Sequence, residues 1–483
     1  MGHVMRCLAL AEAWKDFEGK PFFLMADHLP GFETSLNKNG FTCRYLSSTP
    51  GSDEDAKETI AAAHAVDAEW IVIDGYQFGG RYQDLIKRAG FTLLVIDDYG
   101  HADHYSADII LNQNVYAEKS IYQNIRSDTG LLLGTRYALL RKEFQKWADW
   151  KREVPVTAGK ILVTLGGSDP DNVTQVVIDA LKQIKGKKPE VIIVAGAANP
   201  HIKTIKESVK GYPFFSLQEN VDSMPELMAW ADIAISAGGS TCWELAFMGL
   251  PNLIIVIAEN QQPIADTLDT SGIAVYLGTH TTVSPEKICA TLAPLLDDHQ
   301  KRVSMGRKAR NLVNGRGARC VVIRMHKQDF MVRPVTPDDC HQLFIWANDP
   351  NVRSSSFHPE SIPWDIHVDW FNRKISDPGC SIFIMTTRSG QPVGQIRFDK
   401  TGNTAEVDIS IDEDFRGCGM GSYLIELGVR QFTKRKTDIE IHARVKKENT
   451  SSARAFLNAG FKLSESEKEY GFEVLHVTWR AHD

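Results

Sequence analysis

The chain has 483 residues, of which 43% are hydrophobic and 24% charged, as is usual for globular proteins. This length predicts roughly two to four domains. A net charge of −7 argues against nucleic acid or an anionic membrane as the main partner. The eight cysteines show no C-x-x-C spacing, which suggests neither a disulfide framework nor a zinc site and favours a cytoplasmic location. No apolar run reaches the ~18 residues of a membrane span.

Up to about residue 315, short apolar runs alternate with amphipathic stretches, which is typical of a doubly wound α/β fold. Helices are predicted between the runs, for example over 172–185 and 240–248. A charged, proline-ended segment at 147–155 predicts two halves, 1–150 and 151–315, with a cleft between them. The runs that predict parallel strands buried on both faces are 70–74, 91–97, 160–165, 190–195 and 233–235.

Two glycine-rich turns follow predicted strands of the second half. They are Gly166-Gly167-Ser168 and Gly238-Gly239-Ser240-Thr241. Free backbone amides, hydroxyls and helix N-termini at the carboxyl ends of parallel strands predict phosphate binding. Glu244 lies one helical turn past Ser240, where its carboxylate could accept both hydroxyls of a ribose. The loop Glu259-Asn260-Gln261 follows another strand and brings amide groups to the same cleft.

Together with Gly249-Leu250-Pro251, the second turn, Glu244 and the loop at 259–261 resemble the nucleotide-sugar half of GT-B glycosyltransferases of the MurG type. The whole of residues 1–315 resembles the UDP-sugar hydrolases of the pseudaminic-acid pathway. That family removes UDP from UDP-2,4-diacetamido-2,4,6-trideoxy-β-L-altropyranose. The motifs that carry this second resemblance are 2–11, Asp74-Gly75-Tyr76, Ile96-Asp97-Asp98, 111–114 and 165–169.

The resemblance implies that His3 is the general base that activates water, a role that suits the pKa of histidine. It places Arg6 and Asp74 at the substrate, with Asp97 and Asp98 as further catalytic candidates, and no metal is expected. In that family, a strand and a glycine-rich turn precede the G-H-x-x-R motif, which here begins at Gly2. Since such a strand is normally central, we expect unpaired backbone on two neighbouring strands.

From Met331 the pattern changes to hairpin-like strands, which predicts a third, α+β domain over 332–483. Within it, the predicted strand 406–411 is followed by the turn 416–421 and by a helix that begins near Ser422. Glycines in this turn let the main chain approach an anion closely, and the helix dipole favours negative charge there.

With Asn449 and Gly460-Phe461 downstream, this R-x-x-G-x-G turn resembles the acyl-CoA signature of the GNAT N-acetyltransferases. The resemblance implies that acetyl-CoA is the cosubstrate and that the strand with Ile409 and Ile411 holds its pantetheine arm. Phe456 stands where many relatives have a tyrosine acid, so Glu406 and His442 are candidate proton carriers. The residues that the resemblance places around CoA are Arg416, Gly417, Gly419, Gly421 and Asn449.

The predicted fold class is α/β: a GT-B-like pair of Rossmann-type domains followed by an α+β GNAT domain. The expected function is bifunctional, with 4-N-acetylation of a UDP-4-amino-4,6-dideoxy sugar and hydrolytic release of UDP from the diacetamido product. The expected partners are therefore a UDP-linked amino sugar and acetyl-CoA, without nucleic acid, membrane or metal. Two alternatives stay open. One is a glycosyltransferase fused to an acetyltransferase, and the other is an acetyltransferase with a non-catalytic nucleotide-sugar-binding module.

Overall fold

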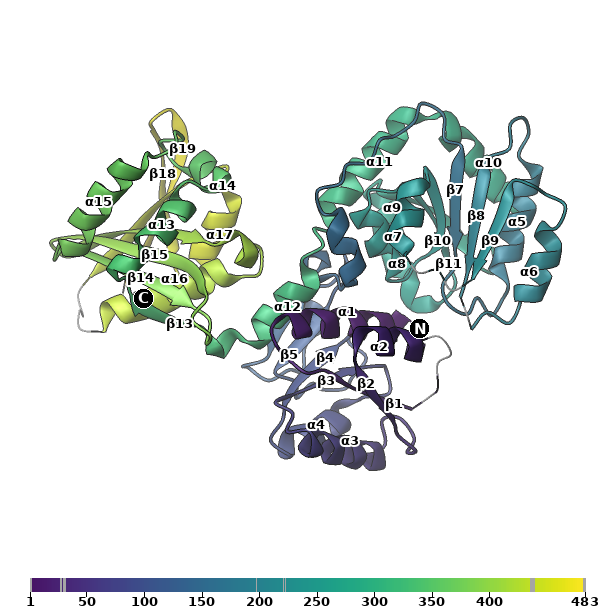
Figure 1. Ribbon diagram of the computed structural model, residues 1–483, viewed down its shortest axis with the longest axis horizontal. Coiled ribbons are helices and arrows are strands. Elements are labelled where there is room, and N and C mark those ends of the chain that lie inside the picture. The colour runs from purple at the N-terminus through teal and green to yellow at the C-terminus, as the bar shows by residue number, and fades with distance from the viewer. Residues whose placement is uncertain are drawn as a thin grey trace. The chain divides into compact units, whose positions relative to one another are not determined.

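The computed structural model describes residues 2–26, 28, 32–196, 198–219, 221, 223–434 and 439–480. The chain forms two compact units, Met1–Val322 and Ile323–Asp483 (Figure 1). The second unit thus begins slightly before the predicted residue 332. Among the helices of the described ranges, none is both long enough and apolar enough to cross a membrane.

The first half of unit 1 contains two separate parallel sheets, with strand orders β1-β2 and β3-β4-β5-β6. Among the described residues, β1 pairs only with β2 and β3 only with β4, so each strand has one edge without a strand partner. The elements are α1 (Gly2–Asp16), β1 (Phe22–Met25), α2 (Phe32–Asn39), β2 (Thr42–Tyr45), α3 (Asp53–Ala65), β3 (Trp70–Asp74), α4 (Gly80–Arg88), β4 (Thr92–Ile96), β5 (Ile109–Asn112), η1 (Lys119–Ile121), β6 (Gly130–Leu133), η2 (Thr135–Tyr137) and η3 (Lys142–Trp147).

Helix α1 contacts both of these sheets. Its Leu8 belongs to a small core that includes Phe32 and Leu36 of α2 and the side chain of Phe23 in β1. On another side of the same helix, Arg6 bonds to Asp74 at the end of β3. The helix therefore links two sheets that share no hydrogen-bonded strands.

The second half of unit 1 has one six-stranded parallel sheet, in the order β12-β11-β10-β7-β8-β9. Its elements are β7 (Lys160–Thr164), α5 (Val173–Gln183), β8 (Glu190–Ala195), α6 (Ile202–Val209), β9 (Phe215–Glu219), α7 (Met224–Trp230), β10 (Ile233–Ala237), α8 (Thr241–Phe247), β11 (Asn252–Val256), η4 (Glu259–Gln261), α9 (Gln262–Thr270), β12 (Ala274–Thr279), α10 (Pro285–Asp297) and α11 (His299–Leu312). Helix α12 (Gly317–Met325) follows and contains the boundary between the two units.

Successive residues of β7 enter different cores. Ile161 and Val163 belong to one hydrophobic cluster, whereas Leu162 packs with Trp243 and Phe247 in another. Side chains alternate across a strand, so both faces of this sheet are buried. The prediction of parallel strands covered on both faces is confirmed for this half.

The boundary between the two halves was predicted at residue 150, but residues before 150 already pack into the second half. Ala138, Leu140 and Phe144 already belong to the core of the second half, and the Phe144 and Phe247 rings are 6.1 Å apart. The predicted boundary was placed at the charged segment 147–155, but this segment is also bound to the second half. Arg152 donates hydrogen bonds to three carbonyl oxygens of the second half.

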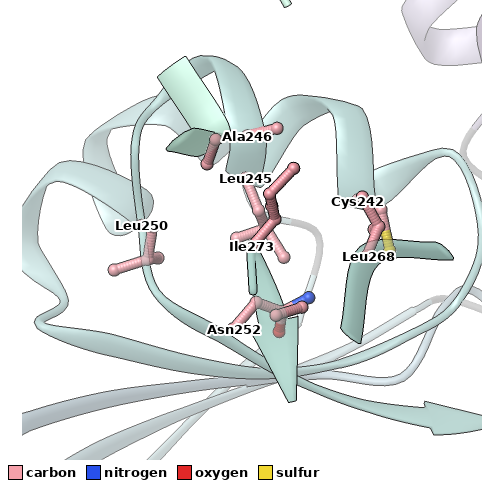
Figure 2. Close-up of a pocket in the computed structure, with 9 residues that line it drawn as sticks. Cys242, Leu245, Ala246, Leu250, Asn252, Leu268 and Ile273 are labelled. Atoms are coloured by element: carbon pink, nitrogen blue, oxygen red, sulfur yellow. The ribbon is translucent and has the colours of Figure 1, made fainter. Parts of the chain in front are cut away.

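A small cavity lies between α8, α9 and β11 (Figure 2). Its volume is about 10 Å³, which is at the lower limit for a single water. The buried Asn252 points its Oδ1 toward no hydrogen-bond partner among the described residues. The cavity is too small for a nucleotide and is a detail of core packing. It is lined by Cys242, Leu245, Ala246, Leu250, Asn252, Leu268, Ile273, Ala274 and Ala309.

Unit 2 has a seven-stranded sheet in the order β13-β14-β15-β16-β17-β19-β18, antiparallel except for the pair β16–β17. Its elements are η5 (Lys327–Asp329), β13 (Met331–Pro334), η6 (Pro337–Asp339), α13 (Cys340–Ala347), α14 (Pro350–Ser355), α15 (Trp364–Ser376), β14 (Cys380–Thr386), β15 (Pro392–Thr401), β16 (Thr404–Ile411), η7 (Glu413–Phe415), α16 (Met420–Thr433), β17 (Glu440–Lys446), α17 (Thr450–Asn458), β18 (Lys462–Glu469) and β19 (Phe472–Arg480).

The helices of unit 2 cover the sheet as the sequence predicts. Thr336 and Asp339 form a capping box at the start of η6, which leads into α13. Leu343 of α13 and Phe371 of α15 pack against β14 in one core. On α16, the Phe432 ring stacks on Phe398 of β15 at 4.2 Å. The mixed α+β prediction for this part of the chain is confirmed.

We expect Arg302 to stabilise unit 1 strongly. It is fully buried on α11 and donates to the carbonyl oxygens of Leu295, Leu296, Pro155 and Val156 at 2.6–2.9 Å. Because hydrogen bonds from charged donors are strong, Arg302→Met should lower the free energy of unfolding by about 2–4 kcal/mol. Urea denaturation would measure this change.

The control for that experiment is Arg307→Met, since Arg307 is exposed on the same helix. Its effect should stay within about 0.5 kcal/mol. Equal effects of the two substitutions would contradict the role of Arg302.

Candidate functional site

The first turn of α1 and the end of β3 hold a charged network. His3 Nδ1 lies 2.6 Å from Asp74 Oδ1. Arg6 donates to both oxygens of Asp74 at 2.6 Å and to Asp98 Oδ1 at 2.8 Å. The structure therefore brings together four residues that the sequence predicts for the site, from α1, the end of β3 and the loop after β4.

The charges in this network support one another. Burial opposes ionisation of Asp74 and Asp98, but the Arg6 guanidinium outweighs it and lowers the pKa of both carboxyls. Nδ1 of His3 also lies 3.1 Å from Nη2 of Arg6. In the tautomer that donates Nδ1–H to Asp74, the lone pair is on Nε2, and the side chain is 40% exposed. This is the arrangement that a general base requires.

Asp97 has a different environment from Asp98. Its side chain is fully buried, and its Oδ1 accepts hydrogen bonds from the backbone amides of residues 98, 99 and 100. His101 Nδ1 lies 3.2 Å from the same oxygen, and the hydroxyl of Tyr105 donates to the other one. In this structure Asp97 is buried and organises the loop after β4. Its catalytic role stays a prediction.

Sequence reasoning did not assign a role to Tyr76, which completes the network. Its hydroxyl donates to Asp98 Oδ2 at 2.6 Å and accepts from Asn260 Nδ2 at 2.8 Å, so it joins the two halves of unit 1. The His3 ring meets the Tyr76 ring edge-on at 5.2 Å. The one sequence signal is the position of Tyr76 in the motif Asp74-Gly75-Tyr76. Asn114 also donates to Asp98, at 2.9 Å.

The turn Gly238-Gly239-Ser240-Thr241 lies close to the start of α1. A Cβ atom at Gly2 would be 3.9 Å from Ser240 Oγ. Gln261 Oε1 accepts hydrogen bonds from the amides of Gly238 and Ile257, both at 3.1 Å, and so fixes the turn against the loop 259–261. The Ser240 side chain makes no capping hydrogen bond to α8, and Glu259 is exposed. The amides of Cys242 and Trp243 donate to the carbonyl oxygens of Gly239 and Ser240, so the turn and the start of the helix are both held in place.

The turn Gly166-Gly167-Ser168 differs from the second turn. Asp169 is buried, and its carboxylate accepts hydrogen bonds from the amides of Val173 and Thr174 at 2.8 and 3.0 Å. An anionic side chain therefore already occupies the N-terminus of α5, and phosphate binding by the turn itself stays a prediction. Gly166 has a φ of +87°, which leaves the turn itself in a conformation that favours glycine.

Glu244, predicted to bind a ribose, has a protein partner in this structure. Its Oε1 lies 3.1 Å from Arg141 Nη2. Arg141 also pairs with Glu143 at 2.6 Å. The sequence contained no local signal for this pairing, because the two partners are 103 residues apart.

In unit 2, β16 and β17 diverge beside the glycine-rich turn. They pair only from Thr404–Glu406 to Glu440–His442, so the backbone at Ile409 and Ile411 has no partner on that side among the described residues. Gly417 and Gly419 have φ values of +77° and +82°, and no side chain of the described part of the chain caps the first turn of α16. A Cβ at Gly421 would lie 3.3 Å from the Ala455 Cβ. Open backbone and uncapped amides thus lie close together in sequence.

Arg416 is part of the scaffold of this turn. Its Nε donates to the Ile411 carbonyl at 2.8 Å, and its Nη1 pairs with Asp349 at 2.9 Å. Its buried Nη2 has no hydrogen-bond partner among the described residues. Asn449 accepts a hydrogen bond from the Ser452 amide at 3.1 Å and so caps α17. Both predicted CoA residues therefore also stabilise the backbone around the turn.

The candidate proton carriers of unit 2 are cross-strand neighbours. Glu406 lies opposite His442 in the sheet, but its carboxylate pairs with Arg444 at 2.7 Å. His442 Nε2 is 3.7 Å from Glu440. Phe456 is buried against Phe461 with ring centroids 5.0 Å apart, so it packs in the core.

One group of side chains in the described residues could hold a metal ion. Ligand atoms of Glu467, Glu469 and His476 lie within 4.8 Å of one another on the hairpin β18–β19. Glu469 already pairs with Arg444 at 3.2 Å and with His476 at 2.8 Å. Arg444 therefore already offsets part of the negative charge of Glu467 and Glu469.

The fold and the two sites define the class of protein: a glycosyltransferase-like nucleotide-sugar module joined to an acetyltransferase domain. Two family comparisons agree. Residues 160–317 match the glycosyltransferase family 28 C-terminal domain, and residues 329–462 match the acetyltransferase (GNAT) domain.

Individual relatives extend this result. A UDP-N-acetylglucosamine–N-acetylmuramyl-(pentapeptide) pyrophosphoryl-undecaprenol N-acetylglucosamine transferase from Carboxydothermus hydrogenoformans is 30% identical over 64% of this chain and 90% of its own. The chain therefore belongs to the family of that transferase, with the GNAT domain as an addition.

Two further relatives differ in how much they share. An uncharacterised protein from Methanocaldococcus jannaschii is 24% identical over 98% of this chain and 97% of its own, so the alignment includes both units. The pseudaminic acid cytidylyltransferase and UDP-2,4-diacetamido-2,4,6-trideoxy-β-L-altropyranose hydrolase of Helicobacter pylori is 27% identical over 42% of this chain. The chain spans 37% of that protein.

We expect His101 to make the stability of unit 1 depend on pH. Burial favours the neutral ring, but the hydrogen bond and charge of Asp97 outweigh it and raise the pKa of His101. Its stabilising contribution is therefore complete below the unfolded pKa of about 6.5 and is lost as pH rises through the higher folded-state pKa.

The measurement is urea denaturation of the protein and of His101→Gln between about pH 6 and 9. The difference in unfolding free energy should shrink as pH rises. Asp97 stays ionised throughout, because His101 and Tyr105 outweigh burial and lower its pKa. A difference that does not change with pH would contradict the pairing.

Proposed function

We propose that the chain is a bifunctional enzyme of nucleotide-sugar metabolism. Unit 2 transfers an acetyl group from acetyl-CoA to the 4-amino group of a UDP-4-amino-4,6-dideoxy sugar. Unit 1 then hydrolyses UDP from UDP-2,4-diacetamido-2,4,6-trideoxy-β-L-altropyranose, a step of pseudaminic acid biosynthesis. The Helicobacter pylori relative supports the second reaction by its name, and the GNAT match supports the first. The two reactions are consecutive, since the acetylated product of one is the substrate of the other.

The observation that carries the hydrolytic proposal is the position of His3. The helix start that bears it lies against Ser240, in the turn predicted to hold the nucleotide, while Asp74 orients the ring. A sugar attached to a diphosphate in that turn would extend toward His3 Nε2. The network of Arg6, Asp74 and Asp98 keeps this helix start in place.

In the proposed hydrolysis, the oxygen of water attacks the anomeric carbon while the bond from that carbon to the diphosphate breaks. The proton of the water moves to Nε2 of His3, and the bonding electrons leave with UDP. Backbone amides of residues 239–241 would stabilise the charge of the leaving diphosphate, because the amide of Gly238 already donates to Gln261. Asp74 stabilises the imidazolium that forms, because it already accepts the Nδ1 proton.

In the proposed acetyl transfer, the amine nitrogen attacks the thioester carbonyl of acetyl-CoA. The new C–N bond forms as the C–S bond breaks, and the thiolate takes up a proton while the nitrogen loses one. The unpaired backbone of β16 would bind the pantetheine arm, and the uncapped first turn of α16 would receive the pyrophosphate.

Glycosyl transfer is a second candidate function for unit 1, favoured by the 30% identity to an N-acetylglucosamine transferase. A transferase needs an acceptor molecule to release UDP at its full rate, whereas a hydrolase needs only water. Release of UDP from the diacetamido sugar nucleotide with no acceptor present would favour hydrolysis. Release only on addition of an acceptor would favour transfer.

We predict that His3→Ala slows UDP release by about 10²–10⁴-fold, which is the usual contribution of a general base. Affinity for UDP should be nearly unchanged, because the predicted nucleotide contacts lie in the second half of unit 1. Coupled detection of UDP would give the rate, and calorimetry the affinity.

His64→Ala is the matched control, because His64 is exposed on α3 and belongs to none of these contacts. It should leave both quantities unchanged. An unchanged rate of UDP release in His3→Ala would remove His3 from the mechanism.

For unit 2 we predict that Gly419→Asp abolishes acetyl-CoA binding. A carboxylate at this position, which has a φ of +82° at the start of α16, would repel the pyrophosphate. Calorimetry with the full chain would measure the affinity for acetyl-CoA.

Gly390→Asp is the control for backbone strain. Gly390 has a φ of +88° and open space around it, in a loop outside the site. It should bind acetyl-CoA normally. Undiminished affinity in Gly419→Asp would argue against CoA binding at this turn.

A further inference from the structure

Arg141 lies in the segment that connects the two halves of unit 1, among several carboxylates. Its Nη1 is 2.6 Å from Glu143 Oε1 and its Nη2 is 3.1 Å from Glu244 Oε1. The guanidinium also lies over the Phe144 ring, 5.5 Å from its centroid. All three charged side chains are largely buried, with 16–24% of their surface exposed. One fork-shaped cation therefore fixes two carboxylates from different elements.

This cluster carries more negative than positive charge. Burial raises the pKa of Glu143 to about 7, and the charges of Glu244, Glu12 and Glu226 add to the effect of burial. Burial also raises the pKa of Glu12 on α1. Arg141 is the cation that offsets this repulsion, which is why its own pKa is raised although burial opposes it.

The same segment is attached to α1. The amide of Lys142 donates to Glu12 Oε2 at 2.7 Å, and its Nζ pairs with Asp16 at 2.5 Å. Helix α1 carries His3 in its first turn. Residues 141–142 thus contact Glu244 on one side and the helix of the predicted base on the other.

We propose that Arg141 is a positioning residue for the nucleotide site, which holds Glu244 in the orientation that accepts ribose hydroxyls and joins it to the helix that bears His3. This inference rests on the proposed function, because it takes Glu244 as the ribose ligand. A buried carboxylate with several anionic neighbours would otherwise turn away from them. Arg141 prevents this, so less reorganisation accompanies nucleotide binding.

The experiment compares binding of UDP and 2′,3′-dideoxy-UDP by calorimetry, since the ratio of their affinities isolates the ribose hydroxyls. The full-length protein should prefer UDP by about tenfold or more, and Glu244→Ala should lose this preference. Arg141→Lys keeps the charge but cannot bridge Glu143 and Glu244. It should weaken UDP binding by about tenfold and leave 2′,3′-dideoxy-UDP unaffected. Arg136→Lys, an exposed position five residues earlier, should change neither.

A double-variant cycle separates positioning from general stabilisation. If Arg141 acts through Glu244, adding Arg141→Lys to Glu244→Ala should cause no further loss of UDP affinity. Additive losses, or equal weakening of UDP and 2′,3′-dideoxy-UDP in Arg141→Lys, would overturn the role of Arg141 and leave the proposed function standing. Failure of the unmodified protein to bind UDP would overturn both.

Glu143→Gln keeps the test decisive if Arg141→Lys does not fold. Four charged side chains act on Glu143. They are Arg141 of the same segment, Glu12 of α1, Glu244 of α8 and Glu226 of α7. As pH rises through about 7, Glu143 ionises and pairs more strongly with Nη1 of Arg141, which keeps Nη2 against Glu244, so the preference for UDP should rise between pH 6 and 8. Glu143→Gln should have a lower preference that does not rise across this range. A preference that is independent of pH in both proteins would overturn the proposal.

Discussion

The buried guanidinium of Arg6 is the contact on which the geometry of unit 1 depends. It joins Asp74 at the end of β3 to Asp98 in the loop after β4 and fixes the start of α1 to both. Burying three charges is costly unless each is paired and hydrogen-bonded. Here Asp98 also accepts from Tyr76 and Asn114, which satisfies most of its remaining capacity. Because β1 and β3 do not pair, α1 and this ionic network connect the two sheets.

Much of the architecture was predictable because it follows from local patterns. Alternate residues such as Ile161 and Leu162 are both apolar, and a strand with two apolar faces must be buried on both. The capping box of Thr336 and Asp339 is a signal within four residues. The turn with Gly417 and Gly419 is equally local, since positive φ angles favour glycine. In each case a few neighbouring residues determine the structure.

The parts that were not predicted depend on contacts between distant residues. The pairing of Glu244 with Arg141 and the bond between Tyr76 and Asn260 join segments more than 100 residues apart. Asp97 and Asp98 are neighbours with similar local sequence, yet one stabilises a loop and the other joins the charged network. Asp169 directly follows the predicted phosphate turn 166–168, and its carboxylate accepts from the first amides of α5. Sequence pattern identifies such side chains as polar and close to a site without showing what each one binds.

The divergence of β16 and β17 has a consequence for the energetics of unit 2. After three paired positions, each strand has one strand partner left within the described ranges, β15 for β16 and β19 for β17. The inner edges therefore leave main-chain donors and acceptors that water or a ligand must satisfy. A ligand that bound along this opening would act as a missing piece of the sheet, and it would bind the folded state alone. By mass action, the folded fraction of unit 2 would then follow the cellular concentration of that ligand.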